Sequence, residues 1–148
     1  MAQVGNMFEV QSVMTTDVIT IRRNATVTEA MELLRKHNVT GLPVVNDDGT
    51  IAGIISEKDV LEFLHDIDDI PSKVEDFMTR DVVTFSQDAN LIDICDLLLK
   101  KHFRRVPIVD GEGKLVGIVT RKDIIQYIVD YHSLFKEVVA APADETAS

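Results

Sequence analysis

The sequence has few of the features that mark secreted or membrane-attached chains. Its 148 residues include one cysteine, Cys95, so no internal disulfide can form, which favours a reducing cytoplasm. No apolar run approaches the roughly 20 residues that span a bilayer. The first ten residues, "MAQVGNMFEV", have neither a basic start nor a long apolar stretch, so they do not resemble a signal peptide. We therefore expect a cytoplasmic protein without a membrane partner.

Basic residues are also scarce. Fifteen Lys and Arg face 25 Asp and Glu, and the net charge is −10. Such a charge opposes non-specific binding to nucleic acid and to anionic membranes, although it permits a local cationic pocket. Otherwise the composition, 45% hydrophobic and 27% charged, is that of an ordinary soluble globular protein.

Catalytic motifs are missing too. The sequence contains no Gly-x-Ser-x-Gly, no Walker loop, no His-Glu-x-x-His and no Cys-x-x-Cys. Its four histidines show no metal-ligand spacing, and Cys95 is interpreted as a small inert core residue rather than a nucleophile. We therefore expect no enzyme, no metal and no required cofactor.

The chain does contain an internal repeat. With an offset of 64 residues, "VMTTDVIT" from Val13 aligns with "FMTRDVVT" from Phe77. The match continues without a gap until "GIISEKDVLEFL" from Gly53 aligns with "GIVTRKDIIQYI" from Gly117. A match of this length indicates that one structural unit has been duplicated.

Each copy predicts the same order of elements. Residues 17–21 and 81–85 are short β-rich runs. Thr26, with Glu29 three residues later, predicts the capped start of a helix, and the equivalent helix begins near Asn90. "LPVVNDDGTIAGII" and "VPIVDGEGKLVGIV" each predict a hairpin, and each copy closes with a helix.

The fold class is therefore α+β, with two tandem β-α-β-β-α units. We place the first unit with its N-terminal segment at 1–66, an acidic linker at 67–76, the second unit with a C-terminal helix at 77–138, and a disordered tail at 139–148.

A Ser/Thr-x-x-Asp element opens the last helix of each copy, as Ser56 with Asp59 and Thr120 with Asp123. One interpretation is structural: the hydroxyl caps the helix and the acid favours its positive end. The other is functional. A carboxylate at this place would repel phosphate, but it suits a ribose, whose two vicinal hydroxyls can both donate to it. The two interpretations are compatible.

From these motifs the chain resembles a pair of CBS domains, also called a Bateman module, over about residues 10–130. The resemblance is carried by the duplicated Met-Thr start, the strands "GLPV" and "RVPI", and the two Gly-x-x-Ser/Thr-x-x-Asp elements. It implies units packed sheet to sheet about a pseudo-twofold axis, with two clefts for adenosyl ligands. AMP, ADP, ATP, S-adenosylmethionine and NAD-type dinucleotides are the candidates, with the ribose on Ser56, Asp59, Thr120 and Asp123.

The resemblance also implies that adenine lies between the first strand and the pre-proline strand of the opposite unit. The residues nominated for adenine are Thr16, Ile19, Val39, Thr40, Gly41, Pro43, Val83, Phe103 and Pro107. For Ile19, Val39 and Val83, core packing is the alternative. The two prolines are better suited to shaping a strand end than to touching a ligand.

Phosphate groups need cations, and the second copy supplies more of them. The residues nominated for phosphate are Arg104, Arg105, Arg121, Lys122 and Lys58. The alternative is a set of solvated cations near helix ends. Because the resemblance groups Arg105 with Asp59, we expect the Asp59 cleft to prefer the more phosphorylated ligand.

These observations favour a stand-alone regulatory module without chemistry of its own. An adenosyl ligand would shift the arrangement of the two units, and an effector protein, which the sequence does not identify, would respond to that shift. The resemblance implies homodimers formed through the helices, and "VLEFLHDI" and "IIQYIVDYHSLF" carry surplus apolar residues for such an interface. The alternative is a structural dimerisation or scaffold protein whose clefts stay empty.

Overall fold

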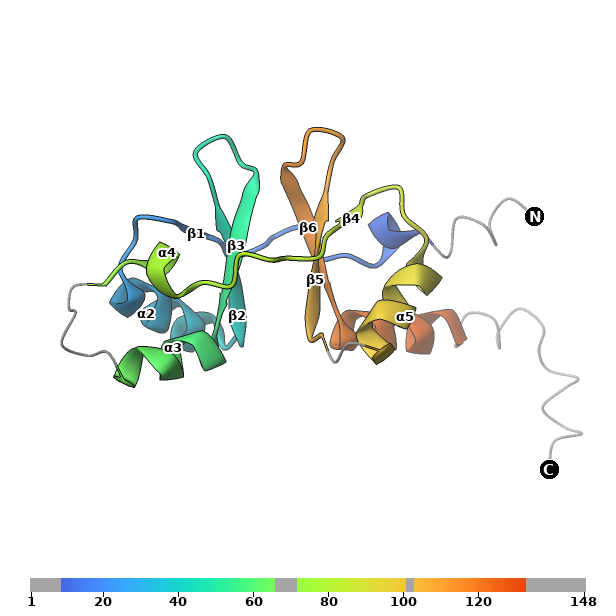
Figure 1. The fold of residues 1–148 in the computed structure, drawn as a ribbon. Coiled ribbons are helices and arrows are strands. Elements are labelled where there is room, and N and C mark those ends of the chain that lie inside the picture. The colour runs from blue at the N-terminus through green and yellow to red at the C-terminus, as the bar shows by residue number, and fades with distance from the viewer. Residues whose placement is uncertain (1–8, 66–71, 101–102, 133–148) are drawn as a thin grey trace, which may run out of the picture. The chain divides into compact units, whose positions relative to one another are not determined.

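The computed structural model describes residues 9–65, 72–100 and 103–132 (Figure 1). The chain divides into two compact units. One comprises residues 16–87 and 107–118, and the other comprises 1–15, 88–106 and 119–148. This division follows the sequence repeat only in part, because residues 9–15 belong to the same unit as the helices of the second copy.

The first copy forms a three-stranded sheet in the order β1-β2-β3. β2 (Gly41–Val45) and β3 (Ile51–Ser56) are antiparallel, so the predicted hairpin is confirmed. Gly49 in its turn has φ +90°, a conformation that other residues rarely adopt. β1 (Ile21–Arg22) adds in parallel to β2.

The second copy repeats this topology in a sheet of order β4-β5-β6. β4 (Phe85–Ser86) is parallel to β5 (Arg105–Val109), and β6 (Leu115–Thr120) completes the sheet. The two sheets and their helices confirm the predicted α+β class with two tandem units. The packing of one sheet on the other stays a prediction.

The first strand of each copy is shorter than we predicted. Strands were expected over 17–21 and 81–85, but each begins only at the last residue of that range. Ile21, the first residue of β1, pairs with Val44, so the residue before it, Thr20, would face Pro43. Proline has no N–H to donate to a ladder, and Pro107 occupies the same place beside β4. Both prolines therefore end a strand pairing.

The helices that the sequence predicts begin where it places them, and η1 and α4 occur in addition. Together they are η1 (Val10–Ser12), α2 (Val27–His37), α3 (Glu57–Phe63), α4 (Val74–Phe77), α5 (Leu91–Lys100) and an unlabelled helix over 121–132. Thr26 caps α2, since its hydroxyl accepts the N–H of Glu29 at 3.1 Å. Asn90 caps α5, since its side chain accepts the N–H of Ile92 at 2.8 Å. Within the described residues, we find no helix with the length and apolar character that crossing a bilayer requires.

Equivalent helix positions are buried in the two copies. In α2 the buried positions are Val27, Ala30 and Leu34, and in α5 they are Leu91, Ile94 and Leu98. Each pair is separated by the repeat offset of 64 residues. A buried stripe at i, i+3 and i+7 is the inward face of an amphipathic helix, so the duplication preserves the packing face as well as the sequence.

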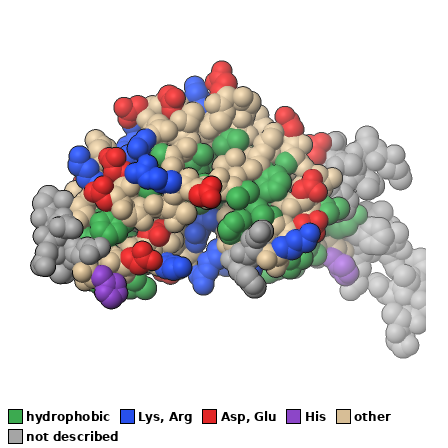
Figure 2. All heavy atoms as spheres, in the orientation of Figure 1, with side chains coloured by type: hydrophobic (Ala, Val, Ile, Leu, Met, Phe, Trp, Pro, Cys, Tyr) green, Lys and Arg blue, Asp and Glu red, His purple; other side chains and the backbone are tan. Residues whose placement is uncertain are grey.

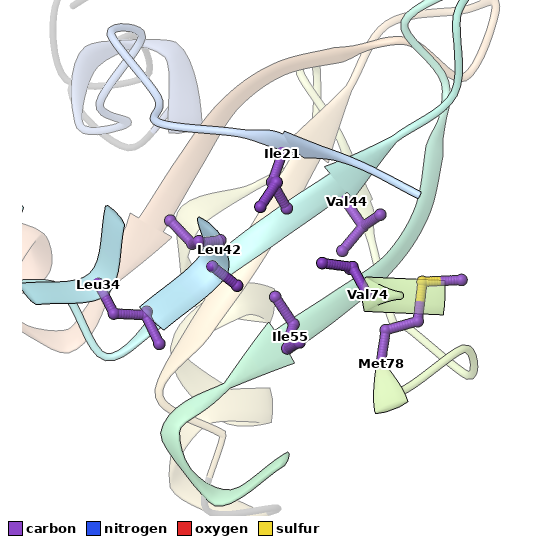
Figure 3. Packing of buried hydrophobic residues seen from close by; sticks show 8 residues of the cluster. Ile21, Leu34, Leu42, Val44, Ile55, Val74 and Met78 are labelled. Atoms are coloured by element: carbon purple, nitrogen blue, oxygen red, sulfur yellow. The ribbon is translucent and has the colours of Figure 1, made fainter. Parts of the chain in front are cut away.

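Figure 3 shows the core of the first copy, where side chains from β1, α2, β2, β3 and α4 meet. Val74 of α4 is fully buried in this cluster, and Met78 just after the helix is 8% exposed. The acidic composition of residues 67–76 predicts a linker. Of these, 72–76 are described, and they include the start of α4.

The segment after α4 lies directly on β3. The N–H of Thr79 donates to the Ile54 carbonyl at 2.8 Å, and the N–H of Ile54 donates to the Thr79 carbonyl at 3.0 Å. A Cβ atom added to Gly53 would lie 2.6 Å from that Thr79 carbonyl and 2.9 Å from the sulfur of Met78. The glycine therefore admits the chain's own Met-Thr segment against the strand.

We predict that Gly53→Ala lowers the free energy of unfolding by about 1–3 kcal/mol, since the new methyl group forces the Met78–Thr79 segment away from β3. Gly111→Ala is the matched control, because an added Cβ there meets nothing within 4 Å. Urea denaturation of both variants measures the difference. Equal stability of the two variants would show that the close approach at Gly53 is not a constraint.

Candidate functional site: two capped carboxylates

The β3–α3 junction holds the first carboxylate. Ser56 has an extended backbone, with φ −116° and ψ 172°, and its hydroxyl accepts the N–H of Asp59 at 3.3 Å. In return, Oδ2 of Asp59 accepts the Ser56 N–H at 2.9 Å and the Ser56 hydroxyl at 3.0 Å. The predicted capping box is therefore confirmed.

The β6–helix junction repeats the arrangement. The Asp123 N–H donates to the Thr120 hydroxyl at 3.2 Å, and Oδ2 of Asp123 accepts the Thr120 N–H at 2.9 Å. Both duplicated acids thus use one carboxylate oxygen within their own helical turn.

The other oxygen of each acid accepts a hydroxyl from a distant segment. The Thr79 hydroxyl donates to Oδ1 of Asp59 at 3.4 Å. The Thr15 hydroxyl donates to Oδ1 of Asp123 at 3.2 Å, across 108 residues of sequence. Each pair lies within one compact unit. Two chain segments therefore hold each carboxylate in place.

The sequence did not assign a role to these threonines. Thr15 and Thr79 are identical residues at the repeat offset, in the Met-Thr start that carries part of the family resemblance. That duplication was a usable signal, but it identifies no contact by itself.

The environments of the two carboxylates differ. Asp59 is only 9% exposed, whereas Asp123 is half-buried. A buried carboxylate is tolerated where donors surround it, and Asp59 has three of them. Ser56 donates its hydroxyl to Asp59, while the Thr120 hydroxyl makes no such bond to Asp123.

The residues nominated for phosphate lie in varied surroundings. Arg121 donates to the Leu98 carbonyl at 3.0 Å, so part of its guanidinium completes the C-terminal end of α5. Lys58, Lys122 and Arg104 are exposed, and Arg105 is half-buried at the start of β5. Their assignment to phosphate stays a prediction.

The residues nominated for adenine fall into three groups by burial. Thr16 and Val83 are exposed, Gly41, Pro43 and Pro107 are buried within β2 and β5, and Ile19, Val39, Thr40 and Phe103 are half-buried. The two prolines are fully buried and end a strand pairing, which supports the strand-shaping interpretation. The adenine assignments as a set stay predictions.

A separate open hollow occurs in the first copy. It is lined by Thr20, Ile21, Arg22, Asn24, Ala25 and Glu29. None of these is a nominated ligand residue.

Other chemistry has little support in the described part of the chain. No three His, Cys, Asp or Glu side chains there come together in a way that could hold a metal ion. Burial, with a smaller contribution from nearby Asp96, raises the pKa of the Cys95 thiol. A raised pKa keeps the thiol protonated at neutral pH, and the thiolate is the nucleophilic form.

The two copies each match the family model described as CBS domain, over residues 10–66 and 74–130. The chain belongs to the CBS-domain family. The match covers both copies of the repeat, including both capped carboxylates and both Met-Thr segments.

Relatives of the chain include an uncharacterised 17.7 kDa protein of Acidianus ambivalens. It is 34% identical over 126 residues, which are 85% of this chain and 76% of that protein. Other curated relatives are longer, and the chain spans 42% of one and 24% of another.

Solved structures that share the fold include two with bound small molecules. One is CBSX2 of Arabidopsis thaliana in complex with AMP, with TM-score 0.77 and 34% identity, covering 84% of this chain and 98% of that one. The other is the CBS domain pair of MJ0100 in complex with 5′-methylthioadenosine and S-adenosyl-L-methionine. It has TM-score 0.71 and 32% identity, and covers 80% of this chain and 98% of that one.

We predict that Ser56→Ala lowers the free energy of unfolding without any ligand, by about 0.5–2 kcal/mol. Thr26→Ala, which removes the ordinary cap of α2, is the matched control. Ser56→Ala should cost at least as much, because it also takes one donor from the buried Asp59. Urea denaturation of both variants gives the comparison. A clearly smaller loss for Ser56→Ala would contradict the capping role.

Proposed function

We propose that this protein is a non-catalytic regulatory module that binds an adenosyl ligand and passes its binding state to an effector protein. The ribose hydroxyls donate to Asp59 and Asp123, with Ser56 and Thr120 beside them. AMP, ADP and ATP are the leading ligands, with S-adenosylmethionine and NAD as alternatives. One observation carries the proposal: both copies hold a carboxylate at the same helical position, with its side chain fixed by hydrogen bonds.

Chemistry supports a neutral diol at this position rather than a phosphate. An ionised carboxylate accepts hydrogen bonds only, and two vicinal hydroxyls can both donate to it. It repels a phosphate, which the nominated cations would have to hold elsewhere. The AMP complex of CBSX2 and the S-adenosylmethionine complex of MJ0100 support an adenosyl ligand, since both proteins share this fold at more than 30% identity.

A second candidate is a scaffold protein with empty clefts. The observation that favours it is that the hydrogen bonds to Asp59 and Asp123 already account for these residues as helix caps. Thermal unfolding separates the two candidates. A ligand at 100 times its Kd adds about 2.7 kcal/mol of stability, whereas a scaffold responds to none of these ligands.

We predict that the combined change Asp59→Asn and Asp123→Asn abolishes the thermal shift produced by adenine nucleotides. An amide offers the diol one neutral acceptor oxygen in place of a charged carboxylate. Asp110→Asn is the control, because Asp110 accepts backbone N–H groups in a hairpin turn and should leave the ligand response intact. A shift that persists in the double variant would rule out ribose recognition by these acids.

We propose a homodimer formed through the last helix of each copy. Leu61 and its repeat equivalent Ile125 are 62% and 61% exposed, and the next pair, Leu64 and Ile128, are 59% and 55% exposed. Single exposed apolar residues are common, but the same two positions in both copies form a repeated pattern. Figure 2 shows that hydrophobic side chains reach the surface on the face drawn there.

We predict that Leu61→Glu or Ile125→Glu converts a dimer to a monomer, because each places an unpaired charge in an apolar interface. Leu99→Glu is the matched control. Leu99 is 76% exposed, but its repeat equivalent is Arg35, so this position lacks the repeated pattern. Sedimentation velocity measures the association state. A wild-type monomer, or a dimer that survives both changes, would exclude this interface.

A further inference from the structure

The two carboxylates have different numbers of acceptor positions left for a ligand. An ionised carboxylate has about four lone-pair positions. Asp59 already accepts three hydrogen bonds, from the Ser56 N–H, the Ser56 hydroxyl and the Thr79 hydroxyl. It has room for about one more.

Asp123 accepts two hydrogen bonds from the part of the chain that the structure describes, from the Thr120 N–H and the Thr15 hydroxyl. It keeps about two acceptor positions, which is the number that a vicinal diol uses. The Thr120 hydroxyl accepts the Asp123 N–H but makes no bond to its carboxylate, so its proton can be donated to a ligand. Asp123 is also the more exposed of the two acids.

We infer that the two sites differ in the number of ribose hydroxyls that they bind. This inference rests on the proposed function. Asp123 accepts both hydroxyls of a ribose and requires an intact diol. Asp59 accepts one hydroxyl, so its site takes adenosyl ligands in which the other hydroxyl is absent. The duplicated motif therefore provides one site selective for ribonucleotides and one that tolerates deoxyribonucleotides.

The difference comes from bonds that the repeat does not share. Thr79 and Thr15 are equivalent and act on Oδ1 of each acid, so they do not distinguish the sites. The distinguishing contact is the Ser56 hydroxyl on Oδ2 of Asp59, at 3.0 Å. Any change that removes one donor from Asp59 should therefore make its site resemble that of Asp123.

Calorimetric titration with AMP, 2′-deoxy-AMP and 3′-deoxy-AMP tests this inference. The Asp59→Asn variant keeps only the Asp123 site intact. At that site, loss of either ribose hydroxyl of AMP should weaken binding about tenfold or more. Asp123→Asn leaves the Asp59 site, where one of the two analogues should bind within about threefold of AMP. Equal penalties for both analogues in both variants would overturn the inference while leaving adenosyl binding intact. Absence of AMP binding to the wild-type protein would instead overturn the proposed function, and this inference with it.

A second variant directly tests the number of acceptor positions that are free on Asp59. In the Asp123→Asn background, Thr79→Val removes one donor from Asp59 and frees an acceptor position. Both deoxy analogues should then bind about tenfold or more weakly than AMP. Thr15→Val in the Asp59→Asn background is the matched control, and it should leave the two penalties at Asp123 as they were. Unchanged tolerance in the Thr79→Val variant would overturn the inference.

Discussion

The hydrogen bonding of one buried carboxylate constrains much of the first copy. Asp59 is 9% exposed, and without donors a buried carboxylate would be strongly unfavourable. Ser56 supplies two donors from the start of the helix, and Thr79 supplies the third from a segment after α4. Thr79 reaches this place because its backbone bridges to Ile54, and that bridge requires the absence of a side chain at Gly53. Strand, helix and Met-Thr segment are thus fixed together through one charged group.

Much of the fold was predictable because its signals are local. The caps at Thr26 and Ser56 depend on residues three positions away, and the hairpins depend on turn residues between two strands. The first strands were overestimated because the length of β1 depends on Pro43 in another strand. The linker assignment missed α4, since Val74 is held by tertiary packing that composition does not reveal.

The candidate site was predictable to a similar extent. The sequence places Ser56, Asp59 and their equivalents at two helix starts, because both a cap and a sugar-binding acid need that pattern. It does not place Thr15 beside Asp123, because 108 residues separate them and no local rule relates their positions. Arg121 shows that a charge in the sequence can also suggest a partner other than the one found in the structure. Its charge suggests phosphate, but one of its nitrogens donates to the Leu98 carbonyl, a partner that depends on the packing of two helices.

The capping role of these acids and the ligand-binding role proposed for them are compatible and reinforce one another. A cap fixes the rotamer of the acid, so the entropy of ordering it is lost on folding rather than on binding, and a preorganised acceptor binds more tightly. The same hydrogen bonds connect the acid to a second segment, as Thr15 does for Asp123 across most of the chain. A ligand that competed for or shared those acceptor positions would therefore act on two segments at once. For this contact to regulate a partner, the ligand would have to bind two states of the chain with different affinities, because it shifts a conformational equilibrium only by as much as those affinities differ.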